Sequence, residues 1–118
     1  MKYYICNAFS LSMLDRESQE FGNDFTDGLR VPRPVDDAAL NEFCRKFLSG
    51  EVEYVSAVGH SDTARVFADY LGLPILTNRV SVKLTEGTRA LIGQYVGPRL
   101  PEGATSLPEG ASIEWWVI

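Results

Sequence analysis

Five stretches of this chain have the residue pattern of β-strands. Residues 3–9 form a run of aromatic and β-branched residues without charge, and residues 51–59 form a second, largely apolar run. Residues 79–84 alternate between polar and apolar side chains, which predicts a strand with one covered face. Two further strands are expected at 88–96 and at 112–118, the segment that contains both tryptophans, one of which is expected in the core.

A stretch with the period of an α-helix covers residues 36–49. Asp36 or Asp37 is expected to cap its N-terminus, and Gly50 is expected to end it. Its apolar residues form a single stripe at helical spacing and are Leu40, Phe43, Cys44, Phe47 and Leu48. This amphipathic pattern predicts a helix with one face packed on the sheet.

A second helix is predicted directly after the strand at 51–59. Ser61 or Asp62 is expected to cap it, and Gly72 to end it. The order of strand, helix, strand, helix and further strands predicts an α/β fold, with a mixed, roughly five-stranded β-sheet flanked by helices. Since the chain has 118 residues, residues 1–118 are expected to form a single small domain.

The remaining segments carry turn signals. Residues 15–30 are polar and contain glycine, so they predict a variable loop, with a helical turn before it at 11–14 and a short strand at its end, 29–31. The sequence LPEGA occurs twice, at 100–104 and 107–111. Each copy is expected to form a turn with proline at the second position and glycine at the fourth, or at the third with a positive φ.

Composition and charge narrow the class of protein. The net charge of −5 argues against long duplex DNA as a partner, because a basic surface supplies most of that affinity. No apolar run reaches the roughly 18 residues of a membrane span, and the N-terminal segment is too short and too polar for a signal peptide. We therefore expect a cytoplasmic protein without a membrane partner.

Cysteines and basic residues add two expectations. Cys6 and Cys44 both lie on apolar faces, so they are expected to be buried thiols, and no Cys/His cluster predicts a metal or another cofactor. Between positions 79 and 99, one acid, Glu86, is accompanied by four basic residues: Arg79, Lys83, Arg89 and Arg99. This local excess suits a small anionic ligand.

The single histidine, His60, lies between the strand at 51–59 and the second helix. Ligands of α/β proteins bind at the carboxyl ends of strands, and the N–H groups at a helix N-terminus favour an anion. Ser61 and Thr63 add hydroxyl donors, so this hinge predicts a phosphate pocket with a titratable group in its wall. The alternative is that His60 is a surface loop residue and that the residues after it only cap the helix.

Further polar residues are expected near the same edge of the sheet. Asn7 and Ser10 follow the first strand and are candidate donors to a ligand, although they also suit a turn and a helix cap. Arg79 and Arg99 would fork onto phosphate, the alternative being two solvated arginines. Gln94 interrupts an apolar strand, so it faces either a ligand or solvent.

Four segments together resemble one small family. They read NAFSLSML at 7–14, SAVGHSDTARV at 56–66, NRVSVKL at 78–84 and GPRLPEGATSLPEGASIEWW at 97–116. The family is that of the viral ring nucleases, type III anti-CRISPR enzymes once catalogued as a domain of unknown function in archaeal viruses, phages, plasmids and some bacterial genomes. The resemblance covers nearly the whole chain, except for part of the predicted loop.

The resemblance implies a homodimer that binds cyclic tetra-adenylate, the second messenger of type III CRISPR complexes, in a cleft across the dimer. It implies cleavage without a metal to linear di-adenylate with a 2′,3′-cyclic phosphate, which would switch off CRISPR ancillary effectors in the host cytoplasm. The family's catalytic histidine falls on His60. Its substrate-binding residues fall on Asn7, Ser10, Arg79, Gln94, Arg99 and Glu102.

The implied chemistry suits these residue types. RNA supplies its own nucleophile, the 2′-hydroxyl, so the protein must align ribose and phosphate and stabilise the charge of the phosphorane. It must also protonate the departing 5′-oxygen, a role for which histidine is the commonest side chain. Two alternatives stay open: a non-catalytic, dimeric regulator that binds nucleotides or nucleic acid, and a dimeric structural protein.

Overall fold

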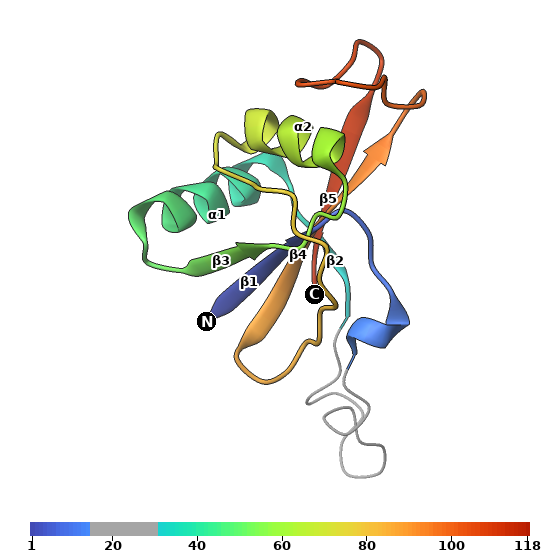
Figure 1. Ribbon diagram of the computed structural model, residues 1–118. Helices are drawn as coiled ribbons and strands as arrows, with labels where there is room; N and C mark the ends of the chain where they lie inside the picture. The colour runs from blue at the N-terminus through green and yellow to red at the C-terminus, as the bar shows by residue number, and fades with distance from the viewer. Residues whose placement is uncertain (15–30) are drawn as a thin grey trace.

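The computed structural model describes residues 1–14 and 31–118. Its five strands form one sheet in the order β2-β5-β4-β1-β3 (Figure 1). The strands are β1 (Lys2–Cys6), β2 (Arg33–Pro34), β3 (Glu53–Ser56), β4 (Thr88–Val96) and β5 (Ser112–Val117). β1 is parallel to both β3 and β4, whereas β5 is antiparallel to β4 and β2 is antiparallel to β5. The predicted mixed α/β sheet is therefore confirmed.

Two helices, α1 (Asp37–Ser49) and α2 (Ser61–Leu71), pack on one face of this sheet (Figure 1). The sheet contributes alternate residues to the core beneath them, among them Ile5, Leu91 and Trp115. The helices contribute their apolar stripes, so residues at helical spacing and residues at strand spacing pack together in a single core. Among the residues that the structure describes, no helix is both long and apolar enough to span a membrane.

α1 follows the prediction closely at both ends. Asp36 is the N-cap, and its carboxylate accepts a hydrogen bond from the backbone N–H of Ala39 at 2.8 Å. Gly50 ends the helix with a φ of 79°, a conformation that glycine adopts without a steric penalty. Leu48 is the exception in the expected stripe, because 64% of it is exposed.

The opposite face of the sheet has a smaller core and no α-helix in the described part of the chain. Cys6, Ile92 and Ile118 come from the strands or follow them, and Val82 and Leu84 pack on them from the segment before β4. The predicted helical turn after β1 is confirmed as the 3-10 helix η1 (Leu11–Met13). This face is therefore only partly covered.

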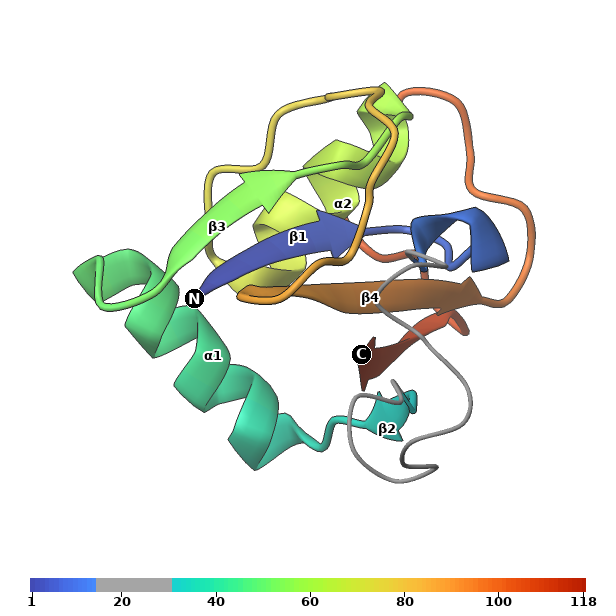
Figure 2. The ribbon, with the colours of Figure 1, turned by 90° about the horizontal axis from the view of Figure 1, so that it is seen from below.

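The prediction of a strand at 79–84 is wrong. Only Leu84 pairs, in an isolated bridge to Leu14, and Val80 on the supposedly covered face is 46% exposed. The backbone N–H of Asn78 donates to the carbonyl of Val58, just after the end of β3. From this end of the sheet, the chain must return to the opposite end, where β4 starts. In Figure 2 the segment, coloured yellow to orange, passes across β1. Its alternation therefore comes from crossing a sheet face and not from pairing within the sheet.

Other boundaries differ by a few residues. The structure has a strand, β2, at Arg33–Pro34. The predicted loop at 15–30 and the first two residues of the strand expected at 29–31 lie outside the described part of the chain. Proline is tolerated in β2 because an edge strand leaves one side without ladder hydrogen bonds. β3 is shorter than the predicted 51–59.

The two LPEGA copies form the same turn. The N–H of Ala104 donates to the carbonyl of Pro101 at 3.1 Å. In the second copy, the N–H of Ala111 donates to the carbonyl of Pro108 at the same distance. Gly103 is the third residue of its turn with a φ of 79°, as one of the two expected geometries required. Proline, however, is the first residue of each turn and not the second.

Candidate functional site

The polar candidates gather where the parallel strands end. β1 lies between β3 and β4 and is parallel to both, so the carboxyl ends of the three strands meet at one edge of the sheet. Asn7 follows β1 directly, His60 follows β3 through a short connection, and Gln94 lies near the end of β4. Such an edge is the usual ligand site of an open α/β sheet.

His60 is the N-cap of α2, where Ser61 or Asp62 had been expected. Its side chain makes no capping hydrogen bond and is exposed, while its carbonyl accepts the bond from Ala64 that starts the helix. The N–H groups of the first turn have no partner within the helix, and such groups favour an anion. A histidine here is available to a ligand in a way that a capping side chain is not.

Arg79 lies against the residue that precedes His60. Its Nη2 donates to the carbonyl of Gly59 at 3.4 Å, and its side chain fills the space beside the Gly59 Cα. A Cβ placed on Gly59 would lie 3.5 Å from Arg79 Nε, an ordinary contact. The space beside Gly59 is therefore occupied by this guanidinium.

Asn78 holds Arg79 in that place. Its Nδ2 donates to the carbonyl of Ser56 at 2.7 Å, and its own N–H donates to the carbonyl of Val58 at 2.8 Å. The hydroxyl of Ser56 in turn donates to the carbonyl of Leu76 at 2.6 Å. Asn78 was not among the predicted site residues, although a polar residue after an apolar segment is a signal of such bracing.

Asp62 connects α2 to the first LPEGA turn. Its Oδ2 accepts a hydrogen bond from the backbone N–H of Gly103 at 3.1 Å, and its Oδ1 accepts one from Arg65 at 2.7 Å. The turn that carries Glu102 is thereby held beside the N-terminus of α2. Arg65 offsets the carboxylate charge, which would otherwise oppose an anion at this position.

Three other predicted site residues have fewer contacts that tie them to the site. Thr63 is partly buried in the first turn of α2. Ser10 is the N-cap of η1 and accepts from the N–H of Ser12, so the capping alternative holds for it, and its substrate role stays a prediction. Arg99 is exposed and has no ion pair among the described residues, and Tyr95 braces the chain just before it by donating to Pro98 at 2.6 Å.

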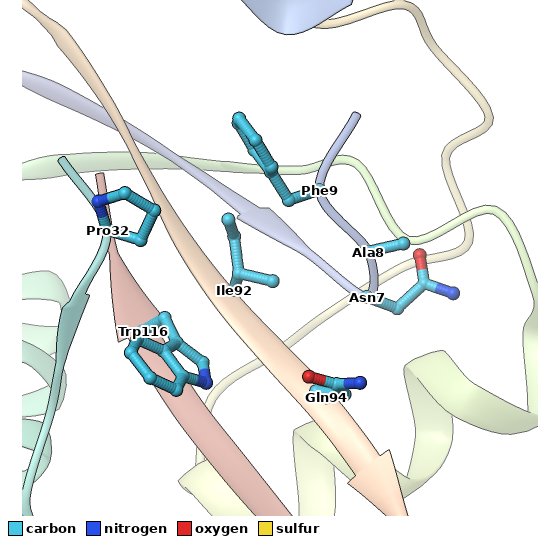
Figure 3. A pocket seen from close by; sticks show the side chains of 7 residues that line it. All are labelled: Asn7, Ala8, Phe9, Pro32, Ile92, Gln94 and Trp116. Atoms are coloured by element: carbon cyan, nitrogen blue, oxygen red, sulfur yellow. The ribbon is translucent and has the colours of Figure 1, made fainter. Parts of the chain in front are cut away.

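Asn7 and Gln94 line a pocket of about 550 Å³ on the sheet face opposite the helices (Figure 3). The other lining residues are Ala8, Phe9, Pro32, Ile92 and Trp116. Figure 3 shows the two amides together at one side of the pocket and Trp116 with Pro32 at the other. The candidates thus fall into two neighbourhoods, one around the start of α2 and one in this pocket.

The two cysteines do not provide a reactive thiolate for this site. Cys6 and Cys44 are free and buried, as predicted. Burial raises the pKa of the Cys6 thiol to about 12 and raises the pKa of Cys44 as well, so neither forms the reactive thiolate near neutral pH. Across residues 1–14 and 31–118, no group of three or more His, Cys, Asp and Glu side chains is placed to hold a metal ion.

These features define a small α/β protein whose polar residues gather at the carboxyl ends of its parallel strands. The chain belongs to the STIV B116-like family, whose family model matches residues 3–110. It is similar to the solved structure of B116 of Sulfolobus turreted icosahedral virus, with 26% identity and a TM-score of 0.71 over 99% of this chain and 97% of that one. A comparison with curated proteins found no match. The family is consistent with the expected resemblance to viral ring nucleases.

Proposed function

We propose that this protein is a metal-independent ring nuclease that cleaves cyclic tetra-adenylate and so switches off CRISPR ancillary effectors. The observation that carries the proposal is an exposed His60 at the start of α2, together with a guanidinium, that of Arg79, on the carbonyl of the preceding residue, Gly59. Membership of a family that includes a viral protein supports the same conclusion. If a virus encodes the chain, it would act in the cytoplasm of the host cell.

The reaction is an internal transesterification. The ribose 2′-oxygen forms a bond to phosphorus, the bond from phosphorus to the 5′-oxygen breaks, and a 2′,3′-cyclic phosphate results. The 2′-hydroxyl loses its proton to solvent water, and His60 donates a proton to the departing 5′-oxygen and regains one from solvent. Arg79, Arg99 and the N–H groups of α2 stabilise the added charge on the phosphorane. Cleavage at two opposite phosphates of the ring gives two linear di-adenylates.

A homodimer suits a ring with four equivalent phosphates. A two-fold axis presents two copies of the same site to opposite phosphates, so that each subunit cuts once. Asn7, Ser10, Thr63, Gln94 and Glu102 are the remaining proposed contacts to this substrate. Light scattering at micromolar concentration is expected to give a dimer, and a monomer both with and without the ring would contradict the model.

Product analysis after incubation with cyclic tetra-adenylate in EDTA tests the proposal. The expected product is linear di-adenylate with a 2′,3′-cyclic phosphate, identified by its mass and by its conversion to a monophosphate in acid. His60→Ala is the matched negative control. Absence of cleavage in EDTA with recovery in Mg²⁺ or Mn²⁺ would overturn a metal-independent mechanism. Tight binding of the ring without any cleavage under either condition would favour the alternative, a non-catalytic regulator.

A further inference from the structure

The pocket on the helix-free face has a composition that phosphate binding does not explain. Most of its described lining residues are apolar, and none of them carries a charge. Its volume of about 550 Å³ is in the range of small-molecule sites, roughly 300–1,000 Å³. A planar, neutral group suits this pocket better than a phosphate does.

The two tryptophans have different surroundings. Trp115 is 5% exposed and lies in the core beneath α2, with its ring centroid 5.1 Å from that of Phe67. Trp116 points to the opposite face, is only partly buried and lines the pocket. No aromatic ring of the described residues stacks on Trp116. As far as the described residues go, its indole can stack on a planar ligand, as aromatic side chains do with unpaired RNA bases.

The two amides supply hydrogen bonds at the other side of the pocket. Neither Asn7 nor Gln94 makes a side-chain hydrogen bond with the residues that the structure describes, and both line the same side of the pocket, across Ile92 from Trp116 (Figure 3). A carboxamide presents a donor and an acceptor side by side, which match N7 and the N6 amino group of adenine. Unpaired amides beside apolar side chains gain most from such a partner.

We propose that this pocket binds an adenine base, with Trp116 as the stacking surface and with Asn7 and Gln94 on the base edge. The inference rests on the proposed function, because it places an adenylate across the ends of β3, β1 and β4. These strands are consecutive in the sheet, so β3 and β4 are about 10 Å apart. That span is comparable to one nucleotide, with its phosphate near His60 and its base in the pocket.

Two dinucleotides, adenylyl-adenosine and uridylyl-uridine, test the pocket directly. Each carries one phosphodiester, so a difference in affinity reports the base and not the charge. With the full chain carrying His60→Ala to prevent cleavage, the adenine dinucleotide is expected to bind about tenfold more tightly, by equilibrium titration. Trp116→Ala is expected to bring this ratio close to one, whereas the matched variant Trp116→Phe keeps a ring and most of the preference.

Gln94→Leu is the second variant, because Trp116 also packs partly on the smaller core and Trp116→Ala could unfold the chain. Gln94 is exposed, so its replacement leaves the fold intact and is expected to reduce the adenine preference alone. Equal affinity for the two dinucleotides, or a preference that persists in folded Trp116→Ala and in Gln94→Leu, overturns the inference.

The outcomes separate this inference from the proposed function. Cleavage of cyclic tetra-adenylate by a protein without adenine preference overturns the base pocket and leaves the nuclease standing. An adenine preference that depends on Trp116 or Gln94, in a protein that does not cleave the ring, supports the pocket and removes the nuclease.

Discussion

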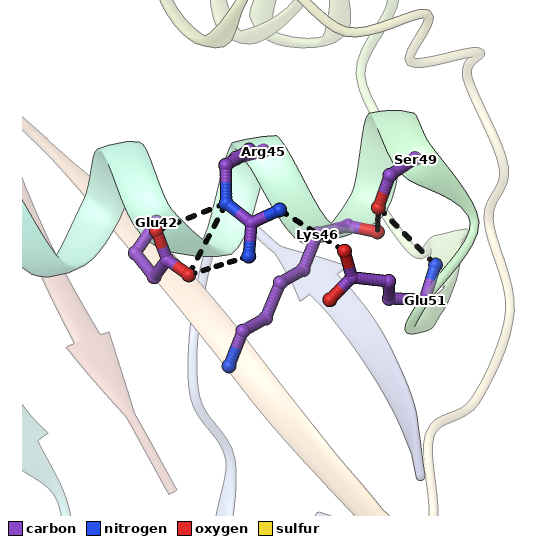
Figure 4. A network of polar contacts seen from close by, with 5 residues as sticks. All are labelled: Glu42, Arg45, Lys46, Ser49 and Glu51. Atoms are coloured by element: carbon purple, nitrogen blue, oxygen red, sulfur yellow. Dashed lines mark hydrogen bonds and ion pairs between the residues drawn. The ribbon is translucent and has the colours of Figure 1, made fainter.

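Arg45, near the end of α1, and Arg79, beside the start of α2, differ in their partners. Near the end of α1, Arg45 pairs with Glu42 at 2.7 Å and with Glu51 at 3.0 Å, a set of ion pairs on the exposed surface (Figure 4). Within the described residues, Arg79 has only the carbonyl of Gly59 as a hydrogen-bond partner, and Arg99 makes no ion pair. The charge of Arg45 is satisfied within the chain, whereas that of Arg79 is available to an anion.

This difference explains how a protein with a net charge of −5 can offer an anion site. Hydrogen bonds from Arg45 lower the pKa of Glu42 and of Glu51, so these acids and their arginine stay charged and paired. A carboxylate that is paired with an arginine contributes less negative potential at a distant site than an unpaired carboxylate does. What decides ligand binding is the pairing of individual cations and not the sum over the chain.

The largest expected effect on binding comes from reversing one charge in each region. Arg79→Glu is expected to weaken the binding of cyclic tetra-adenylate roughly thirtyfold or more, because attraction to phosphate becomes repulsion at close range. Arg45→Glu changes the net charge equally but lies in the paired set, so binding should stay within about threefold of the wild type. Equilibrium titration at low salt makes the comparison, and equal losses in both variants would contradict it.

A smaller effect is expected from the link between α2 and the turn that carries Glu102. Asp62→Ala removes the acceptor of the Gly103 N–H, so hydrogen exchange at Gly103 should accelerate and cleavage should slow about three- to tenfold. Asp62→Asn keeps an acceptor oxygen and serves as the matched control. Unchanged exchange at Gly103 in Asp62→Ala would show that the turn is held by other contacts.

Patterns among residues close in sequence were enough to predict most of the fold. The α1 stripe, its N-cap Asp36 and the strand Thr88–Val96 were all predictable, because each depends on residues close in sequence. The segment at 79–84 has the strand period without the pairing, since any chain lying on a sheet face alternates in burial. No local signal distinguishes the two cases.

The candidate site was predictable in its residue types but not in its connections. Position between a strand and a helix was enough to single out His60. The bond from Gly103 to Asp62 joins residues 41 apart in sequence, and the bond from Asn78 to Ser56 joins residues 22 apart. Which tryptophan faces the pocket depends on strand register, which the sequence does not state.

The smallest effect concerns the ion pairs of α1 alone. The pKa values of Glu42 and Glu51 are lowered in the folded state, so their stabilisation is present above the ordinary glutamate pKa of about 4.3. It is lost as the pH falls through the lowered values, when both acids become protonated. Thermal midpoints of the wild type and Arg45→Ala should therefore differ slightly at pH 7 and converge in acid. A gap that widens on acidification would contradict this sign.

The most direct test of the account measures three properties on one preparation of His60→Ala: single-turnover cleavage, affinity for cyclic tetra-adenylate and thermal midpoint. His60 is exposed and makes no capping bond, so the midpoint should hardly change. Arg79 and the N–H groups of α2 remain, so affinity should stay within about threefold, while cleavage slows by roughly 10² or more. Cleavage within about threefold of the wild type, too small a change for a lost general acid, would contradict the central claim.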